Sequence, residues 1–382
     1  MRILLVGAGL ANASFIHFFR KASLCHQLKP KFTVIDRRPW IGGNCYTHSD
    51  HQTGATVHAY GPHIFNTDSQ RAWSFMCSYL DMQPFVNRVK AMAPSGVYTL
   101  PINLHTINQF YGKKLSPHEA ATFIDTIRSP HRRERPSNFE EAMLGHIGRE
   151  LYEEFIYGYT LKQWGREPSE LPATIATRLP FRLDYDDNYY NKKYQGIPAN
   201  GYTELFEKIM HNDDVEISLD TAYEGSLSND FDLTLYSGPI DEYFGFADGR
   251  LSYRTVYWER RLSEGSYQGN AVVNYTDPGV PHTRINEPRY FEPWKQAQSA
   301  QSVYFVEYSK ETGANDEPFY PIRSSTDMEL LAKYQARAKH GSHAADTRVI
   351  FHGRLGSYRY LDMDRIIDEA ADLADSVAAS SR

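Results

Sequence analysis

The chain has 382 residues, of which 41% are hydrophobic, so it is long enough for two or three domains with a sizeable core. Its formal net charge is -6 and it has no long basic run, which excludes nucleic acid as an expected partner. The three cysteines lack metal-ligand spacing and no stretch approaches the roughly 18–20 apolar residues of a membrane helix, so we expect a cytoplasmic protein with reduced thiols, no metal site and no membrane span.

The N-terminus has the pattern of a dinucleotide-binding unit. A short apolar strand at residues 3–6 leads into a tight turn with Gly7 and Gly9, and a helix is predicted directly after it. Glycines at this turn let the backbone approach a pyrophosphate at the helix N-terminus. A second predicted strand ends at Asp36, where a carboxylate could bind a ribose hydroxyl. One residue departs from the pattern, because Asn12 stands where a third small residue is usual.

Two turn-rich segments follow the second strand. Gly42 and Gly43 are adjacent and again permit a close approach of the backbone, and Asn44 comes directly after them. Residues 60–67 form a further turn-rich segment with polar side chains. We expect the glycine pair to lie beside the same cofactor.

The middle of the chain changes to a helical pattern over residues 104–166. Ser116 and Glu119 have the spacing of a capping box, with a proline between them at the first helical position. Apolar residues recur at helical spacing over residues 139–159. These patterns predict a group of helices inserted after the N-terminal unit.

Strands are predicted over much of the remaining chain. Segments rich in β-branched and aromatic residues at 178–187 and 251–308 indicate a largely antiparallel sheet. Further strands are expected at 215–219, 233–236 and 349–351, with a late glycine turn and a helix over 364–377. Because this last strand, turn and helix complete the N-terminal unit, that unit is predicted to be discontinuous in sequence.

Many short segments, in order along nearly the whole chain, share a family's motifs: IGGN at 41–44, YGPHIF at 60–65, LPINLHTINQF at 100–110, GYTLKQWG at 158–165, ELPATIATRLPFR at 170–182, DDNYY at 186–190, YQGIP at 194–198, SGPID at 237–241, TRINE at 283–287, FYPI at 319–322 and GRLGSYRYLDMD at 353–364. With these segments the chain resembles the bacterial UDP-galactopyranose mutase family. Members are flavoproteins that interconvert the pyranose and furanose forms of a nucleotide-sugar. One such motif would be weak evidence, but this many in register indicate membership.

The resemblance implies an α/β fold in three parts. These are a discontinuous Rossmann-like FAD domain, an inserted helical bundle and a twisted antiparallel β-sheet domain. It also implies a homodimer and a cellular reductant such as NAD(P)H. We place the FAD domain at residues 1–80, 200–245 and 318–382, the helical domain at 104–166, and the sheet domain at 81–103, 167–199 and 246–317.

The resemblance further implies a reaction without net oxidation. In this family the N5 atom of reduced FAD attacks the anomeric carbon and displaces the nucleotide diphosphate. The flavin–sugar adduct then recloses through another hydroxyl to give the furanose, a precursor of cell-surface polysaccharide. The protein then has to orient the reactants and stabilise charge, and arginine forks are suited to a diphosphate. By motif, the two arginines are Arg178 and Arg284.

The remaining site residues are also implied by motif. His63 lies in the loop on the flavin face and joins the two arginines as a catalytic candidate. The substrate contacts are Phe155, Tyr159, Trp164, Tyr189, Asn274, Tyr320 and Tyr360, and Phe155 could equally be a core residue of its helix. The cofactor contacts are Gly7, Gly9, Asp36, Gly42, Gly43, Asn44, Arg354, Asp362 and Met363.

One further departure leaves the sugar open. Asn66 stands where galactose-specific members carry a second histidine near flavin and sugar, so we count it among the substrate contacts. UDP-galactose is the first choice of substrate, and an N-acetylated or dTDP-linked sugar is the alternative. An amine-oxidase-like flavin oxidoreductase and a non-catalytic nucleotide-sugar binding protein are the competing functions.

Overall fold

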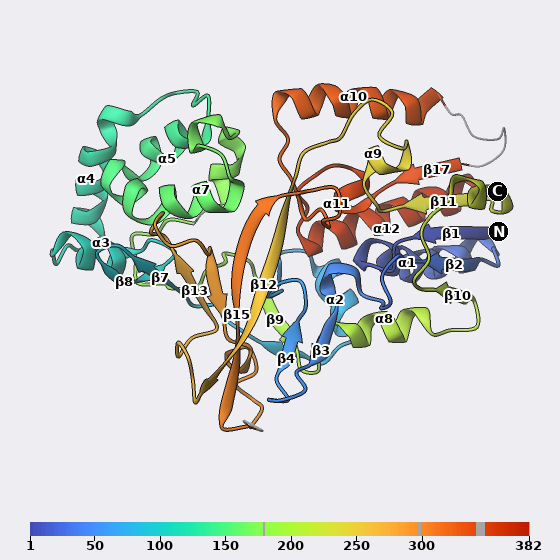
Figure 1. The fold of residues 1–382 in the computed structure, drawn as a ribbon, viewed down its shortest axis with the longest axis horizontal. Coiled ribbons are helices and arrows are strands. Elements are labelled where there is room, and N and C mark those ends of the chain that lie inside the picture. Colours follow the sequence, from blue (N-terminus) through green and yellow to red (C-terminus); the bar gives the residue numbers. More distant parts are fainter. Residues whose placement is uncertain (179, 297–298, 341–347, 382) are drawn as a thin grey trace.

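A computed structural model describes residues 1–178, 180–296, 299–340 and 348–381, apart from the side chains of residues 177, 178 and 340. Figure 1 shows three parts next to one another. A sheet with helices on its faces lies at the right and carries both chain ends, long strands of a second sheet lie in the middle, and a group of helices lies at the left.

The sheet that carries the chain ends has five parallel strands in the order β10-β2-β1-β11-β17. Four consecutive residues of β1 are buried, as is typical of a parallel strand covered on both faces. Because its strands come from distant segments of the chain, this part is discontinuous in sequence. The strands are β1 (Arg2–Val6), β2 (Lys31–Ile35), β10 (Val215–Ser218), β11 (Leu233–Tyr236) and β17 (Arg348–Phe351).

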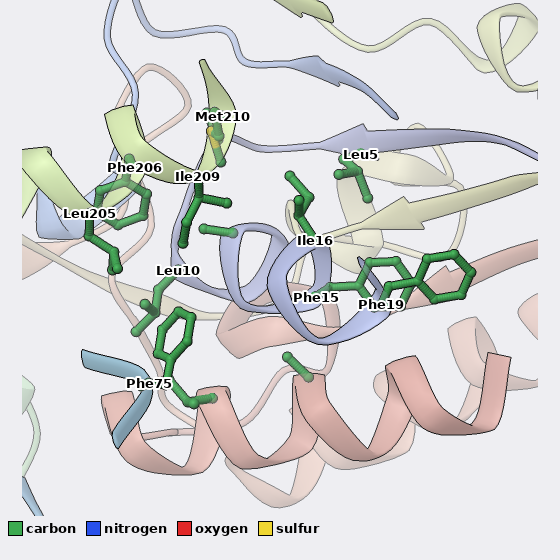
Figure 2. Packing of buried hydrophobic residues seen from close by; sticks show 14 of the residues in the cluster. Leu5, Leu10, Phe15, Ile16, Phe19, Phe75, Leu205, Phe206, Ile209 and Met210 are labelled. Atoms are coloured by element: carbon green, nitrogen blue, oxygen red, sulfur yellow. The ribbon is translucent and has the colours of Figure 1, made fainter. Parts of the chain in front are cut away.

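Helix α1 (Leu10–His26) is the centre of the largest core. Phe15 and Phe19 are fully buried and stack with ring centroids 5.2 Å apart. Figure 2 shows α1 between the sheet and a long helix, with Leu10 next to Phe75. The helices that share this core are α2 (Gln70–Cys77), α8 (Thr203–Met210) and the long C-terminal α12 (Met363–Ser380).

The second large sheet has seven strands in the order β16-β12-β15-β14-β13-β7-β8. Its neighbouring strands are antiparallel except for β13 and β7, which run parallel, so the sheet is mixed. The strands are β7 (Val89–Ala93), β8 (Gly96–Leu100), β12 (Tyr253–Glu264), β13 (Val272–Tyr275), β14 (Arg284–Asn286), β15 (Gln301–Glu311) and β16 (Tyr320–Pro321).

The prediction of strands at residues 178–187 is wrong. In the described part of this segment, a single bridge joins Phe181 to Ile102. The guanidinium of Arg182 donates instead to the backbone carbonyls of Asp186, Asn188 and Tyr190. The loop is therefore held by a side chain and does not need a strand ladder.

Two small sheets are present besides the two large ones. One pairs β3 (Thr47–Ser49) with β4 (Thr56–His58), and the other has the order β5-β9-β6. Its strands are β5 (Phe65–Thr67), β6 (Met82–Pro84) and β9 (Tyr194–Pro198).

The helical part begins with α3 (Leu104–Tyr111) and α4 (Pro117–Arg128), and Ser116 and Glu119 form the predicted capping box. The helical pattern of 139–159 is interrupted at Gly148, which has φ +83° and marks the end of α5 (Phe139–Ile147). A side chain there would also press on Ile127, because a Cβ would lie 3.1 Å from its Cγ1. The pattern continues as α6 (Arg149–Tyr152), a π-helical turn (Glu153–Tyr157) and α7 (Gly158–Trp164).

The remaining helices are α9 (Ile240–Tyr243), α10 (Ser325–His340) and α11 (Gly353–Gly356). Among the described residues, no helix combines the length and the apolar character that crossing a membrane would require.

Candidate functional site

The turn after β1 forms a glycine cradle with a second loop. Gly7 has φ +104°, a conformation that favours glycine, and its N–H donates to the Ile35 carbonyl at 2.8 Å. A Cβ on Gly43 would lie 2.9 Å from the Cα of Gly9, so the two loops meet backbone to backbone. Gly9 caps α1 without a side-chain hydrogen bond, so the first-turn N–H groups remain for an anionic ligand. The cradle fits the pyrophosphate of a dinucleotide cofactor.

Asp36 follows the carboxyl end of β2, next to this cradle. Its Oδ2 accepts from the Ala8 N–H at 2.7 Å and its Oδ1 from the Arg38 N–H at 2.8 Å. The Arg38 guanidinium donates to Asn44 Oδ1 at 3.0 Å and pairs with Glu317 at 2.6 Å. The carboxyl edge of a parallel sheet is where such folds bind nucleotides, and the predicted cofactor residues at the N-terminal end come together here.

A cleft of about 1130 Å³ opens among all three parts of the fold. The predicted residues come from distant segments, and the fold places them along the wall of one cleft. Arg178 ends a short 3₁₀ helix (Ala173–Arg178), and its side chain lies outside the described residues. The predicted residues that line the cleft are His63, Asn66, Phe155, Tyr159, Trp164, Tyr189, Asn274, Arg284, Tyr320, Arg354, Tyr360, Asp362 and Met363.

Arg284 pairs with Glu307 across the β14–β15 ladder. Arg284 Nη2 and Nε lie 2.7 and 2.8 Å from Glu307 Oε2. The Glu307 side chain is only 1% exposed, whereas that of Arg284 is 25% exposed and borders the cleft. Burial opposes the charged form of Arg284, but the Glu307 carboxylate, Tyr159 and Tyr320 together outweigh burial and hold the pKa of Arg284 above its ordinary value. The cation is thus anchored on its sealed side and open toward the cleft.

Two tyrosines and a second arginine form another part of the wall. The rings of Tyr320 and Tyr360 stack with centroids 5.1 Å apart, and the Arg354 guanidinium lies 5.3 and 5.4 Å from the two centroids. Burial raises the pKa of Tyr320 to about 12, so its hydroxyl stays a hydrogen-bond donor at neutral pH. Arg354 Nη2 donates to the Leu361 carbonyl at 2.8 Å, which fixes the arginine beside the stack.

Comparison with known proteins identifies the family. Residues 154–360 match the sequence model described as UDP-galactopyranose mutase, and residues 5–80 match an NAD(P)-binding Rossmann-like domain. A probable UDP-galactopyranose mutase of Klebsiella pneumoniae is 46% identical over 378 residues, covering 99% of this chain and 95% of that protein. The chain belongs to the UDP-galactopyranose mutase family. A dTDP-fucopyranose mutase of Escherichia coli is 40% identical over 98% of this chain and 97% of its own length.

Solved structures agree on the fold. The crystal structure of a reduced UDP-galactopyranose mutase matches with a TM-score of 0.74 at 14% identity, covering 100% of this chain and 96% of that one. A putrescine oxidase matches with a TM-score of 0.56 at 11% identity over 99% of both chains. Likenesses at such identities show the fold alone, and they confirm the predicted fold class. The family consists of FAD-dependent isomerases, so this chain is an isomerase that uses FAD.

The helical side of the mutase cleft is built by α7 and the π-helical turn. Phe155 lines the cleft and is also a core residue, 2% exposed, with edge contacts to Tyr98 and Phe110 at 5.0 and 5.6 Å. Trp164 ends α7, where Arg254 Nε donates to the Gln163 carbonyl at 3.1 Å. Phe155 therefore belongs to the core and also borders the cleft, and its contact with substrate stays a prediction.

Two histidines lie together at the cleft, where His63 lines the wall and His58 packs beside it. The rings of His58 and His63 are nearly parallel with centroids 6.4 Å apart, and the backbone N–H of His63 donates to the ring atom Nδ1 of His58 at 3.1 Å. His63 Nδ1 lies 2.7 Å from the Gly61 carbonyl, which makes Nδ1 the protonated nitrogen and leaves Nε2 as an acceptor. Burial, followed by the nearby His58 and Arg354, lowers the pKa of His63 to about 3, and burial lowers that of His58 to about 4.

These histidines make the stability of the apoprotein depend on pH. Their folded-state pKa values lie below the unfolded value of about 6.5, so the unfolded chain binds protons at a higher pH than the folded protein does. The free energy of unfolding is therefore highest above pH 6.5 and falls as the pH drops toward 4. We expect the free energy of unfolding to drop by about 1–2 kcal/mol per histidine between pH 6.5 and 5. Urea unfolding midpoints at both pH values measure this, and His58→Phe should flatten the profile. Equal stability of the parent at the two pH values would contradict the assignment.

Sequence analysis missed two residues that support the site. Glu307 is an acidic residue within the apolar strand segment 303–308, and this contrast is the sequence feature that could have marked it as a supporting residue. Arg182 holds the loop that carries Tyr189 and Tyr190, through the carbonyl contacts described above. Arg182 ends one of the segments that carry the family resemblance, but that motif does not reveal the contacts of Arg182 with the following loop, which include Asp186 and Asn191 as well as the carbonyls.

Proposed function

We propose that this chain interconverts the pyranose and furanose forms of a nucleotide-sugar, with UDP-galactose as the first candidate. The carrying observation is the Arg284–Glu307 pair, which holds an open guanidinium at a cleft wall shared with two stacked tyrosines. A diphosphate needs charge and several hydrogen-bond donors at once, and this wall offers both. The family membership supports the same reaction class.

When bound and reduced, FAD supplies a nucleophilic N5 atom. The chain then has to hold the diphosphate while its bond to the anomeric carbon is broken. Arg284 binds phosphate oxygens with its free N–H groups, and the hydroxyls of Tyr320 and Tyr360 donate to the same group. By motif we assign Arg178 as the second phosphate-binding arginine. Charge that develops on the leaving group is thereby met by donors that are already in place.

The other cleft residues divide between the two ends of the substrate. We propose that Phe155 and Tyr159, which come from the helical side, enclose the base and that Trp164 lies near the sugar. Tyr189 and Asn274 contact the diphosphate-sugar region, and Asn66 and His63 lie on the flavin side with the sugar. Arg354, Asp362 and Met363 are assigned to the flavin, and the glycine cradle with Asp36 and Asn44 to the rest of FAD.

A dTDP-linked sugar is the second candidate substrate. The observation that favours it is the 40% identity to a dTDP-fucopyranose mutase, combined with Asn66 in place of the histidine of galactose-specific members. The homodimer, the NAD(P)H reductant, the cytoplasmic location, a role in cell-surface polysaccharide synthesis and the domain boundaries stay predictions.

The test is a turnover panel with dithionite-reduced enzyme. UDP-galactose, UDP-N-acetylgalactosamine and dTDP-fucose, each in pyranose and furanose form, are incubated and the products analysed for ring form. We expect interconversion of at least one pair, only with reduced enzyme. Oxidation of an added amine with every sugar unchanged would favour the oxidoreductase, and UDP binding without conversion in either redox state would favour a binding protein.

A further inference from the structure

Asn12 is the residue that departs from the dinucleotide pattern, and its side chain is fully buried. Its Nδ2 donates to the Gly7 carbonyl at 2.7 Å and to the Val6 carbonyl at 3.1 Å. A side-chain amide has two N–H donors, so both are used. The amide is therefore oriented by the end of β1, and its Oδ1 must find a partner elsewhere.

That partner is His352, 340 positions later in the chain. His352 Nε2 lies 2.7 Å from Asn12 Oδ1. Since the oxygen can only accept, Nε2 carries the hydrogen and the tautomer of the imidazole is set. The backbone of His352 is held as well, because its N–H donates to the Tyr236 carbonyl at 3.1 Å. Asn12 thus joins α1 to the residue that follows β17.

Each end of this contact leads to a different part of the cofactor site. The Gly7 carbonyl belongs to the same peptide plane as the Ala8 N–H, which donates to Asp36 Oδ2 at 2.7 Å. The bond from Asn12 therefore sets the plane that holds the carboxylate assigned to the ribose. At the other end, His352 directly precedes Gly353 and Arg354, whose guanidinium lies beside the stacked tyrosines of the cleft.

We propose that Asn12 and His352 form a positioning pair for FAD, which locks the pyrophosphate turn to the flavin-side segment after β17. The proposal rests on the cofactor site assigned above and is independent of which sugar is converted. In this chain a polar pair replaces the small residue that usually lets the helix pack on the strand. An asparagine at a fully buried position is stable only when its donors and its acceptor are paired, and His352 supplies the one partner that β1 cannot.

The test measures FAD affinity of the refilled apoprotein by quenching of flavin fluorescence. Asn12→Gly and His352→Val each leave the other polar side chain without its partner, and each should weaken FAD binding by about 10-fold or more. The double variant Asn12→Gly/His352→Val leaves neither of them orphaned and should bind FAD more tightly than either single variant. His352→Gln keeps an N–H donor and should stay within about threefold of the parent.

A matched control lies on the same helix. His17 Nδ1 is 2.6 Å from the Tyr79 hydroxyl, and this partly buried pair joins α1 to another segment without touching the cradle. Tyr79→Phe should lower the Tm without changing FAD affinity. The proposal is overturned if Asn12→Gly and His352→Val lower only the Tm and leave FAD affinity unchanged, as Tyr79→Phe does. It is also overturned if the fold-loss of FAD affinity in the double variant equals the product of the two single fold-losses. If no sugar of the panel is converted while the FAD affinities follow the expected order, the proposed function is refuted and the positioning role of Asn12 and His352 is still supported.

Discussion

Arg284→Ala is expected to lower kcat/KM by about 10²–10³-fold while the protein still binds FAD. Arg284 lies at the cleft wall with its outer N–H groups free of carboxylate, because Glu307 occupies only the sealed side. Loss of the fork removes charge stabilisation of the departing diphosphate, and nothing on the cradle side changes. The measurement is steady-state turnover of reduced enzyme, together with the flavin absorbance of the purified protein.

Two variants separate this effect from a loss of stability. Arg284→Lys keeps a cation for Glu307 but loses the planar fork, so it should fold normally and still lose most activity. Arg260→Ala breaks a comparable pair away from the cleft, where Arg260 Nε lies 2.8 Å from the buried Asp50 carboxylate. Near-parental kcat/KM in Arg284→Ala and Arg284→Lys would refute the phosphate-binding role.

Glu307→Gln is expected to reduce the free energy of unfolding by about 3–5 kcal/mol, because it leaves the Arg284 cation without its buried partner. The loss is large since the carboxylate also accepts from Trp258 Nε1 at 3.0 Å and from Thr283 Oγ1 at 3.2 Å. A diphosphate in the cleft would supply the missing negative charge. UDP should therefore raise the Tm of Glu307→Gln by more than it raises that of the parent.

Thermal unfolding of both proteins, with and without UDP, measures this difference. Equal UDP-induced shifts would show that Arg284 does not contact the diphosphate. Asp50→Asn, which disturbs the Arg260 pair, is the control: its Tm should fall, and its UDP-induced shift should match that of the parent.

The parts of the fold that follow from local chemistry could be predicted well. Local sequence predicts the strands β1 and β11 from their buried runs and the start of α4 from the capping box at Ser116, because propensity and capping act within a few residues. The segment after residue 178 was mispredicted because its apolar residues suggest strands. In the fold, Arg182 binds carbonyls four to eight residues further along the chain, and these contacts hold the segment as a loop. The helix break at Gly148 could be predicted only in part, since the sequence shows the glycine but does not show that it packs against Ile127.

The sequence by itself determined the family and the kind of cofactor, and it named substrate-site candidates that the fold places on the cleft wall, because motifs keep their order along the chain whatever the fold does. Only the tertiary structure decided how those residues are charged and held. Arg284 needs Glu307 from a neighbouring strand, and Asn12 needs His352 from the far end of the chain. Both partnerships are hydrogen bonds of about 3 Å or less between side chains that are distant in sequence, and no local pattern carries that information. The departure at Asn12, which weakened the dinucleotide pattern when only the sequence was considered, is in the fold a fully buried side chain paired with the half-buried His352.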